Sequence, residues 1–197
     1  MRKPGTRIIL LVSLGIALIV LLLWLPRQPA SAREKAAAPS DPDSLKLAMA
    51  VEMVNGENPM EGIMMLRELV EKDSTNVEAQ YWLGVFAIKS GQLDKAVQRF
   101  QTVLRLRPDY LAACIDLGGA YLQKQELDQA LVYFRRGIEI DSTNNYALLF
   151  AAQTLEKKEQ LAEARLYYQQ LLRHNTDTVV TRRVQEFIEN INTKLNP

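Results

Sequence analysis

The sequence predicts an all-α protein in which one N-terminal transmembrane helix precedes a solenoid of four helix pairs and a C-terminal capping helix. Three observations support this prediction. An uncharged apolar run lies near the N-terminus, a pattern of small and aromatic residues recurs every 34 residues, and an amphipathic stretch follows the last repeat. These three features divide the chain into an apolar N-terminal segment and a folded helical body.

The N-terminal segment begins with residues 1–7, which carry three cations and are predicted to be a cytoplasmic n-region. Residues 8–25 follow as an eighteen-residue run without a charge. As a helix the run would cover roughly 27 Å, close to the hydrocarbon thickness of a membrane. It predicts a transmembrane helix or signal anchor, with the membrane as one partner. The expected location is a bacterial inner membrane, crossed once, with the repeats in the periplasm.

Residues 26–42 are rich in proline and alanine, which predicts a linker without regular helix. A second reading of the N-terminus stays open here. The tripeptide Ala30-Ser31-Ala32 supplies the small residues that a signal peptidase accepts, so cleavage after Ala32 would release a soluble exported protein. Both readings carry the helical body across a membrane.

The helical body contains four copies of one pattern, in residues 43–76, 77–110, 111–144 and 145–178. Each copy has a small residue at its eighth position, a second small residue twelve positions later and a large one four positions after that. In chain order these are Ala50, Gly62 and Leu66; Gly84, Ala96 and Phe100; Gly118, Ala130 and Phe134; and Ala152, Ala164 and Tyr168.

This spacing predicts two packed helices in each copy. The small residues allow two helices to approach closely, and the large residue four positions later lies on the same helical face. Polar breaks at 55–58, 90–92 and 124–126 separate the helices within a copy. Residues 179–197 then predict a capping helix with an apolar stripe, formed by Val180, Val184, Phe187, Ile188, Ile191 and Leu195.

On these residues the chain resembles the tetratricopeptide repeat (TPR) family over 43–178, about 70% of its length. The two middle copies match the family pattern best, through Leu83, Gly84, Ala96, Phe100 and Pro108, and through Leu117, Gly118, Tyr121, Ala130 and Phe134. The resemblance implies a right-handed superhelical solenoid. It also implies a noncatalytic scaffold that binds protein or peptide partners along the first helices of its repeats.

The candidate partner-binding residues are the first-helix positions one turn apart, where the family makes its ligand contacts. They are mostly apolar, which favours an apolar peptide or an amphipathic helix as ligand. The alternative is that these side chains simply pack against neighbouring helices. The candidates are Leu47, Val51 and Val54; Tyr81, Val85 and Ile88; Ile115, Gly119 and Leu122; and Tyr146, Leu149 and Gln153.

The remaining side chains offer little chemistry. Cys114 is the only cysteine and His174 the only histidine, so the sequence predicts no catalytic residue, no metal site and no cofactor. Residues 43–197 hold 18 basic and 21 acidic residues, which speaks against nucleic-acid binding. A small-molecule substrate is not expected either.

The function predicted from the sequence is therefore a membrane-tethered, noncatalytic adaptor. Among relatives of this layout it resembles accessory proteins of envelope assembly and of c-type cytochrome maturation. A self-associating structural protein, with a second copy covering the apolar row, is the alternative, so a homo-oligomer stays open.

Overall fold

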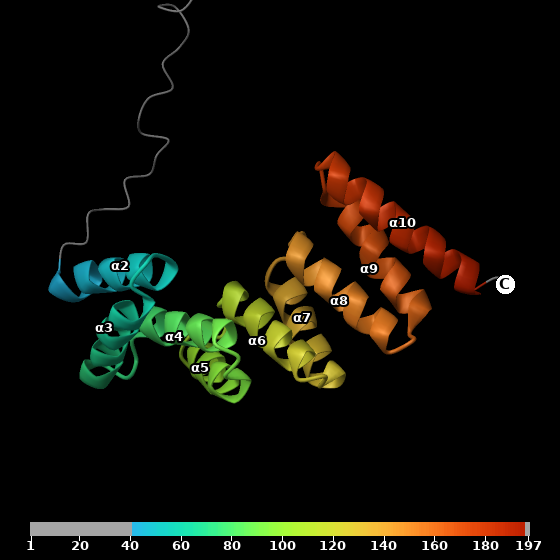
Figure 1. Ribbon diagram of the computed structural model, residues 1–197. Coiled ribbons are helices and arrows are strands. Elements are labelled where there is room, and N and C mark those ends of the chain that lie inside the picture. The colour runs from blue at the N-terminus through green and yellow to red at the C-terminus, as the bar shows by residue number, and fades with distance from the viewer. Residues whose placement is uncertain (1–40, 196–197) are drawn as a thin grey trace, which may run out of the picture. The chain divides into compact units, whose positions relative to one another are not determined.

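The computed structural model describes residues 41–195, which form nine α-helices (Figure 1). The all-α prediction is confirmed for this part of the chain. The helices are α2 (Pro42–Asn55), α3 (Pro59–Lys72), α4 (Val77–Lys89), α5 (Leu93–Leu106), α6 (Leu111–Gln123), α7 (Leu127–Ile140), α8 (Asn145–Lys157), α9 (Leu161–His174) and α10 (Thr178–Leu195).

Two of the first helices begin at the same side-chain cap. The Asn76 side chain accepts a hydrogen bond from the Ala79 backbone N–H (3.0 Å) at the start of α4. Asn144, 68 residues later, accepts one from Ala147 at the same distance and starts α8. Each cap satisfies a backbone donor that the helix leaves unpaired. The sequence Asp-Ser-Thr-Asn, which occurs at 73–76 and again at 141–144, therefore sets where these two helices begin.

The turns between the two helices of the last three pairs share one left-handed residue. Gly91, Gln125 and Glu159, spaced 34 residues apart, have φ angles of 71°, 63° and 60°. The backbone N–H after each of them bonds back five residues, which caps the preceding helix end. These bonds are Gln92 N–H to Ala87 O (2.8 Å), Glu126 N–H to Tyr121 O (2.9 Å) and Gln160 N–H to Leu155 O (2.9 Å).

The helices stack in chain order, and each first helix packs on the second helix of its pair (Figure 1). Each first helix also contacts the next first helix along, from α2 to α4, α6 and α8. Among the described residues no second helix, α3, α5, α7 or α9, contacts another second helix. The first helices are therefore closer together, and they lie on the inner side of the stack.

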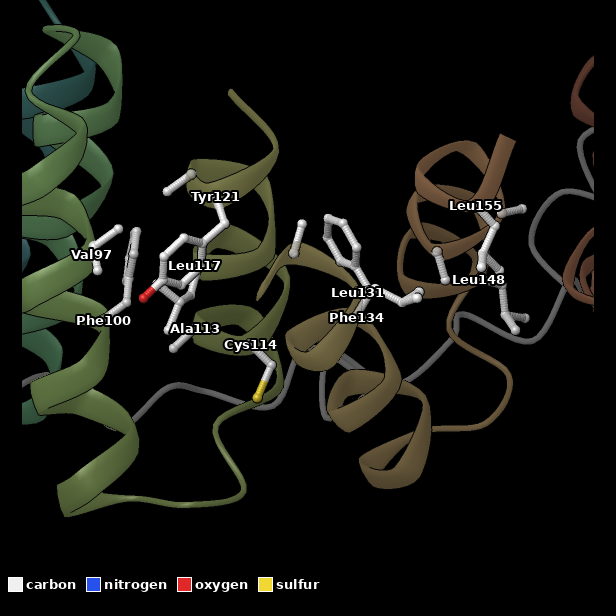
Figure 2. Packing of buried hydrophobic residues seen from close by; sticks show 14 of the residues in the cluster. Val97, Phe100, Ala113, Cys114, Leu117, Tyr121, Leu131, Phe134, Leu148 and Leu155 are labelled. Atoms are coloured by element: carbon white, nitrogen blue, oxygen red, sulfur yellow. The ribbon is translucent and has the colours of Figure 1, made fainter. Parts of the chain in front are cut away.

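The main hydrophobic core runs from α4 to α10. Figure 2 shows part of it as a row of side chains that passes from Phe100 through Leu117 and Phe134 to Leu148. Glycine is required where α4 and α6 lie against buried aromatic rings. A Cβ on Gly84 would lie 2.7 Å from the Phe100 ring, and one on Gly118 would lie 2.6 Å from the Phe134 ring. A smaller cluster joins α2 and α3 to α4 through Ala50, Val54, Ile63, Leu66, Leu69, Ala79 and Leu83.

At the C-terminal end, α10 covers α9. Val184 and Ile191 are buried in the main core, and the Phe187 ring lies 5.4 Å from that of Tyr168. Of the predicted stripe, Val180 and Ile188 are half-buried and Leu195 is exposed.

The segment at 8–25 that was predicted to cross a membrane lies outside the described residues. Within residues 41–195 no helix combines the length and the apolarity needed to cross a membrane. The structure therefore gives no support to the predicted single-pass location.

Candidate functional site

The candidate site is the first-helix row, the twelve residues predicted above on α2, α4, α6 and α8. These four helices contact one another in order, so the row runs along adjacent helices. Most of its side chains are half-buried. Val54 differs, since it is only 5% exposed and belongs to the small core cluster. Tyr146, at the other end, is 66% exposed.

On α4 the row is held in place by a polar contact between repeats. The Tyr81 hydroxyl donates a hydrogen bond to Asp116 Oδ2 on α6 (2.8 Å), and its ring lies 5.1 Å from that of Tyr110. Burial raises the pKa of the Asp116 carboxyl, while the hydrogen bond from Tyr81 opposes that rise. The hydrogen bond and the ring contact therefore fix the orientation of Tyr81.

Tyr110 is fixed in the same way. Its hydroxyl donates to Glu78 Oε2 (2.8 Å), and Arg107 approaches the second Glu78 oxygen at 3.1 Å. Burial, followed by the hydrogen bond to Glu78, raises the pKa of Tyr110 above its ordinary value. The row therefore has a polar margin of Glu78, Tyr110 and Asp116, which sequence reasoning missed because these residues do not share the repeat's apolar spacing.

The centre of the row is open at Gly119 on α6. A Cβ built there meets no atom within 4 Å, whereas a Cβ on the neighbouring Gly118 would strike Phe134. Gly118 thus has a packing role and Gly119 has none within the described chain. Glycine inside a helix lowers its stability by about 1 kcal/mol relative to alanine. Gly119 therefore destabilises α6, and it leaves a patch of helix backbone uncovered.

The α8 end of the row is more polar. Tyr146 stacks on Phe150 with a ring separation of 6.4 Å, and Gln153 is half-buried one turn beyond Leu149. The Tyr168 hydroxyl from α9 donates a hydrogen bond to Glu156 Oε2 (2.5 Å). The row is therefore apolar at α2 and ends at α8 with the amide of Gln153, and the Glu156 carboxylate lies three residues beyond it.

The described part of the chain shows no cluster of three metal-ligating side chains. Cys114 is fully buried, and burial raises the pKa of its thiol, which disfavours the nucleophilic thiolate. His174 is exposed at the end of α9. The first-helix row presents apolar, aromatic and amide groups.

The stack of helix pairs defines a class of protein, the helical-repeat proteins. Residues 87–141 match the tetratricopeptide repeat family model, which supports the TPR assignment made from the sequence. TPR scaffolds are generally noncatalytic and typically mediate protein–protein interaction.

One curated relative supports the same family. The chain is 37% identical over 65 residues to the tetratricopeptide repeat domain-containing protein PYG7, chloroplastic, of Arabidopsis thaliana. The match covers 33% of this chain and 22% of the relative, so the chain spans less than a quarter of the relative's length. That relative is a chloroplast protein and the described helices include no membrane span, so the predicted location in a bacterial inner membrane with a periplasmic body is wrong.

Solved structures agree on the fold. The PilF structure of Pseudomonas aeruginosa superimposes with a TM-score of 0.65 at 20% identity, over 78% of this chain and 74% of that one. MamA from Desulfovibrio magneticus RS-1 gives a TM-score of 0.62 at 19% identity, over 79% and 96%. At these sequence identities the structural similarity supports a TPR-like stack of helices, which is a statement about the fold alone.

Proposed function

We propose that this protein is a noncatalytic adaptor that binds an apolar peptide or amphipathic helix of a protein partner along the first-helix row. The open surface at Gly119 carries the proposal, because the glycine costs helix stability and relieves no clash within the described chain. The half-buried apolar side chains on either side, Val85, Ile115 and Leu122, would supply contact area. We also propose that the four repeats span residues 43–76, 77–110, 111–144 and 145–178.

The polar residues at the α8 end of the row suggest how a bound helix would be oriented. Apolar anchors would lie over Val85, Gly119 and Leu122, while the polar face of the ligand would meet Gln153 and Glu156 toward α8. Interfaces of this kind combine a buried apolar centre with a polar rim.

The test is to fill the open surface without disturbing the core. Gly119→Trp places a large ring where a Cβ meets nothing, and Gly119→Ala is the matched control. Tagged full-length protein is expressed in its native cells, and co-purifying proteins are quantified. We expect a partner that is retained by the wild type and Gly119→Ala and reduced at least about tenfold by Gly119→Trp, which corresponds to roughly 1.4 kcal/mol. An identical set of proteins on all three baits would contradict the proposal.

A second candidate, self-association, is favoured by the exposed end of the stack. Leu45 and Met49 on α2 are 51% and 44% exposed, although the residues one period later, Ala79 and Leu83, are buried against the preceding pair. A second copy packed on α2 would cover them. Light scattering of the full chain at several concentrations distinguishes the two, since Met49→Glu would dissociate a dimer of this kind and would leave a first-helix ligand bound.

A further inference from the structure

The outer side of the stack contains a charged cleft that neither the repeat pattern nor the proposed function explains. Because α3 and α5 do not contact each other, residues of α4 form the floor between them. A hollow of about 60 Å³ opens there, with room for a small charged group. We call this the α3–α5 cleft, and its lining is Ile63, Arg67, Leu83, Phe86, Ala87, Gln92, Lys95 and Arg99.

The cleft has three cations and no acid among the residues that line it. Arg67 lies on α3, and Lys95 and Arg99 lie on α5. None of the three forms an ion pair with a described carboxylate. Burial, and then the like charge of Arg67, lowers the pKa of the Arg99 guanidinium.

Arg99 is held in position by a buried amide. Its Nη1 donates to Gln80 Oε1 (2.6 Å), and Gln80, only 4% exposed, donates through Nε2 to the Ser74 carbonyl (3.0 Å). This chain of hydrogen bonds fixes the guanidinium with a neutral acceptor. It leaves the positive charge of Arg99 uncompensated, and a fixed guanidinium is well suited to a carboxylate.

The repeats supply an internal comparison. Two periods after Arg67 and Lys95 stand Arg135 and Glu163, and these two form an ion pair between α7 and α9. The same places one period after the cleft hold Gln101 and Gln129. The α3–α5 cleft thus has a lysine where the equivalent place between α7 and α9 has the carboxylate that neutralises the arginine.

We infer that the α3–α5 cleft binds a carboxylate side chain from an acidic peptide segment of a protein partner, in the place that Glu163 takes between α7 and α9. The half-buried Phe86 ring on the floor of the cleft would contact an apolar side chain next to that carboxylate. The ligand is therefore a segment in which acidic and apolar residues alternate. This site lies on the second-helix side and is separate from the first-helix row.

The test uses the full chain and an octapeptide of alternating Glu and Leu that carries a neutral fluorophore. A Gln–Leu octapeptide of the same length is the neutral comparison, and binding is measured by fluorescence anisotropy at several salt concentrations. We expect the Glu–Leu peptide to bind at least about tenfold more tightly than the Gln–Leu peptide at low salt, and to weaken as salt rises.

Two variants and two controls locate the site. Arg67→Gln should weaken binding of the Glu–Leu peptide at least about fivefold. Lys95→Glu should abolish binding and should also raise the unfolding temperature, because it would form an ion pair with Arg67 like Arg135–Glu163. Arg105→Gln removes an equal charge from α5 outside the cleft and should change affinity less than about twofold. Gly119→Trp should leave it unchanged, which separates this site from the first-helix row.

Three results would overturn the inference. The two peptides could bind equally, or Arg105→Gln could weaken binding as much as Arg67→Gln. Alternatively, inorganic phosphate could raise the unfolding temperature through Arg67 and Lys95 while the Glu–Leu peptide fails to bind, which would make the cleft a small-anion site.

Discussion

Two adjacent glycines on α6 have opposite roles, and the difference can be measured. Gly118→Ala would place a Cβ 2.6 Å from the buried Phe134 ring, so we expect a loss of about 1–3 kcal/mol from overpacking. Gly119→Ala meets nothing and should gain about 1 kcal/mol from helix propensity. Urea unfolding of the two variants beside the wild type checks both signs. A loss of stability at Gly119 would mean that the helix surface there is already occupied.

The Tyr81 hydroxyl should matter for stability because it supports the carboxylate of Asp116. Tyr81→Phe removes this donor, and we expect a cost of about 1–2 kcal/mol at neutral pH. Tyr146→Phe, at an exposed tyrosine, is the control and should change stability by less than about 0.5 kcal/mol.

The pH dependence of that loss has a definite sign. Burial raises the folded-state pKa of Asp116 above its unfolded value, so the folded protein binds the proton more readily, and this group contributes more stability as pH falls. Tyr81→Phe removes an interaction that lowers this pKa. The deficit of the variant should therefore be largest at neutral pH and shrink below the folded pKa. Thermal unfolding from pH 7 to pH 4 measures it, and a deficit that grows toward acid pH would refute this assignment.

At the scale of the helices, the left-handed turns are the clearest point of strain. Gln125 and Glu159 adopt the backbone conformation that Gly91 adopts in the equivalent turn. A left-handed backbone conformation destabilises a residue with a Cβ by about 1 kcal/mol relative to glycine. Gln125→Gly and Glu159→Gly should therefore each stabilise the protein by about that amount. Gly91→Ala should cost about the same. The thermal unfolding midpoints of the three variants test this prediction. A lower midpoint for Gln125→Gly would show that contacts of the Gln125 side chain stabilise the fold by more than its backbone conformation costs.

Much of this element-scale arrangement could be predicted from the sequence, because each break is a local signal. The polar breaks at 90–92 and 124–126 fall between helices, and the Asn76 and Asn144 caps start α4 and α8. Contacts between repeats were harder to predict. The Tyr81–Asp116 bond joins residues 35 positions apart on two repeats, and no short pattern marks it.

The cations of the α3–α5 cleft are visible in the sequence as a departure from the repeat pattern. Comparing each repeat with the one two periods later would have shown Lys95 in the place of Glu163. Its geometry could not be inferred, because the separation of α3 and α5 depends on how the pairs stack.

At the scale of the whole described body, stability should be uneven along the stack. The main core is continuous from α4 to α10, while α2 and α3 pack on α4 through a small separate cluster. In a repeat array each unit is supported only by its neighbours, so an end pair with an uncovered face opens first. We expect amide hydrogens of α2 and α3 to exchange at least about tenfold faster than those of α6 and α7. Equal protection in native-state hydrogen exchange would mean that the first pair belongs to the same cooperative unit.

The central claim is that a protein partner lies along the inner, first-helix side of the stack. Its most direct measurement is photo-crosslinking in native cells, with a photoreactive residue at Leu122 in the first-helix row or at the exposed Val132 on α7. The account predicts one identified partner captured from Leu122, lost when Gly119→Trp is added, and absent from Val132. Capture only of further copies of this chain from Leu122, or the same partner from both positions, would contradict it.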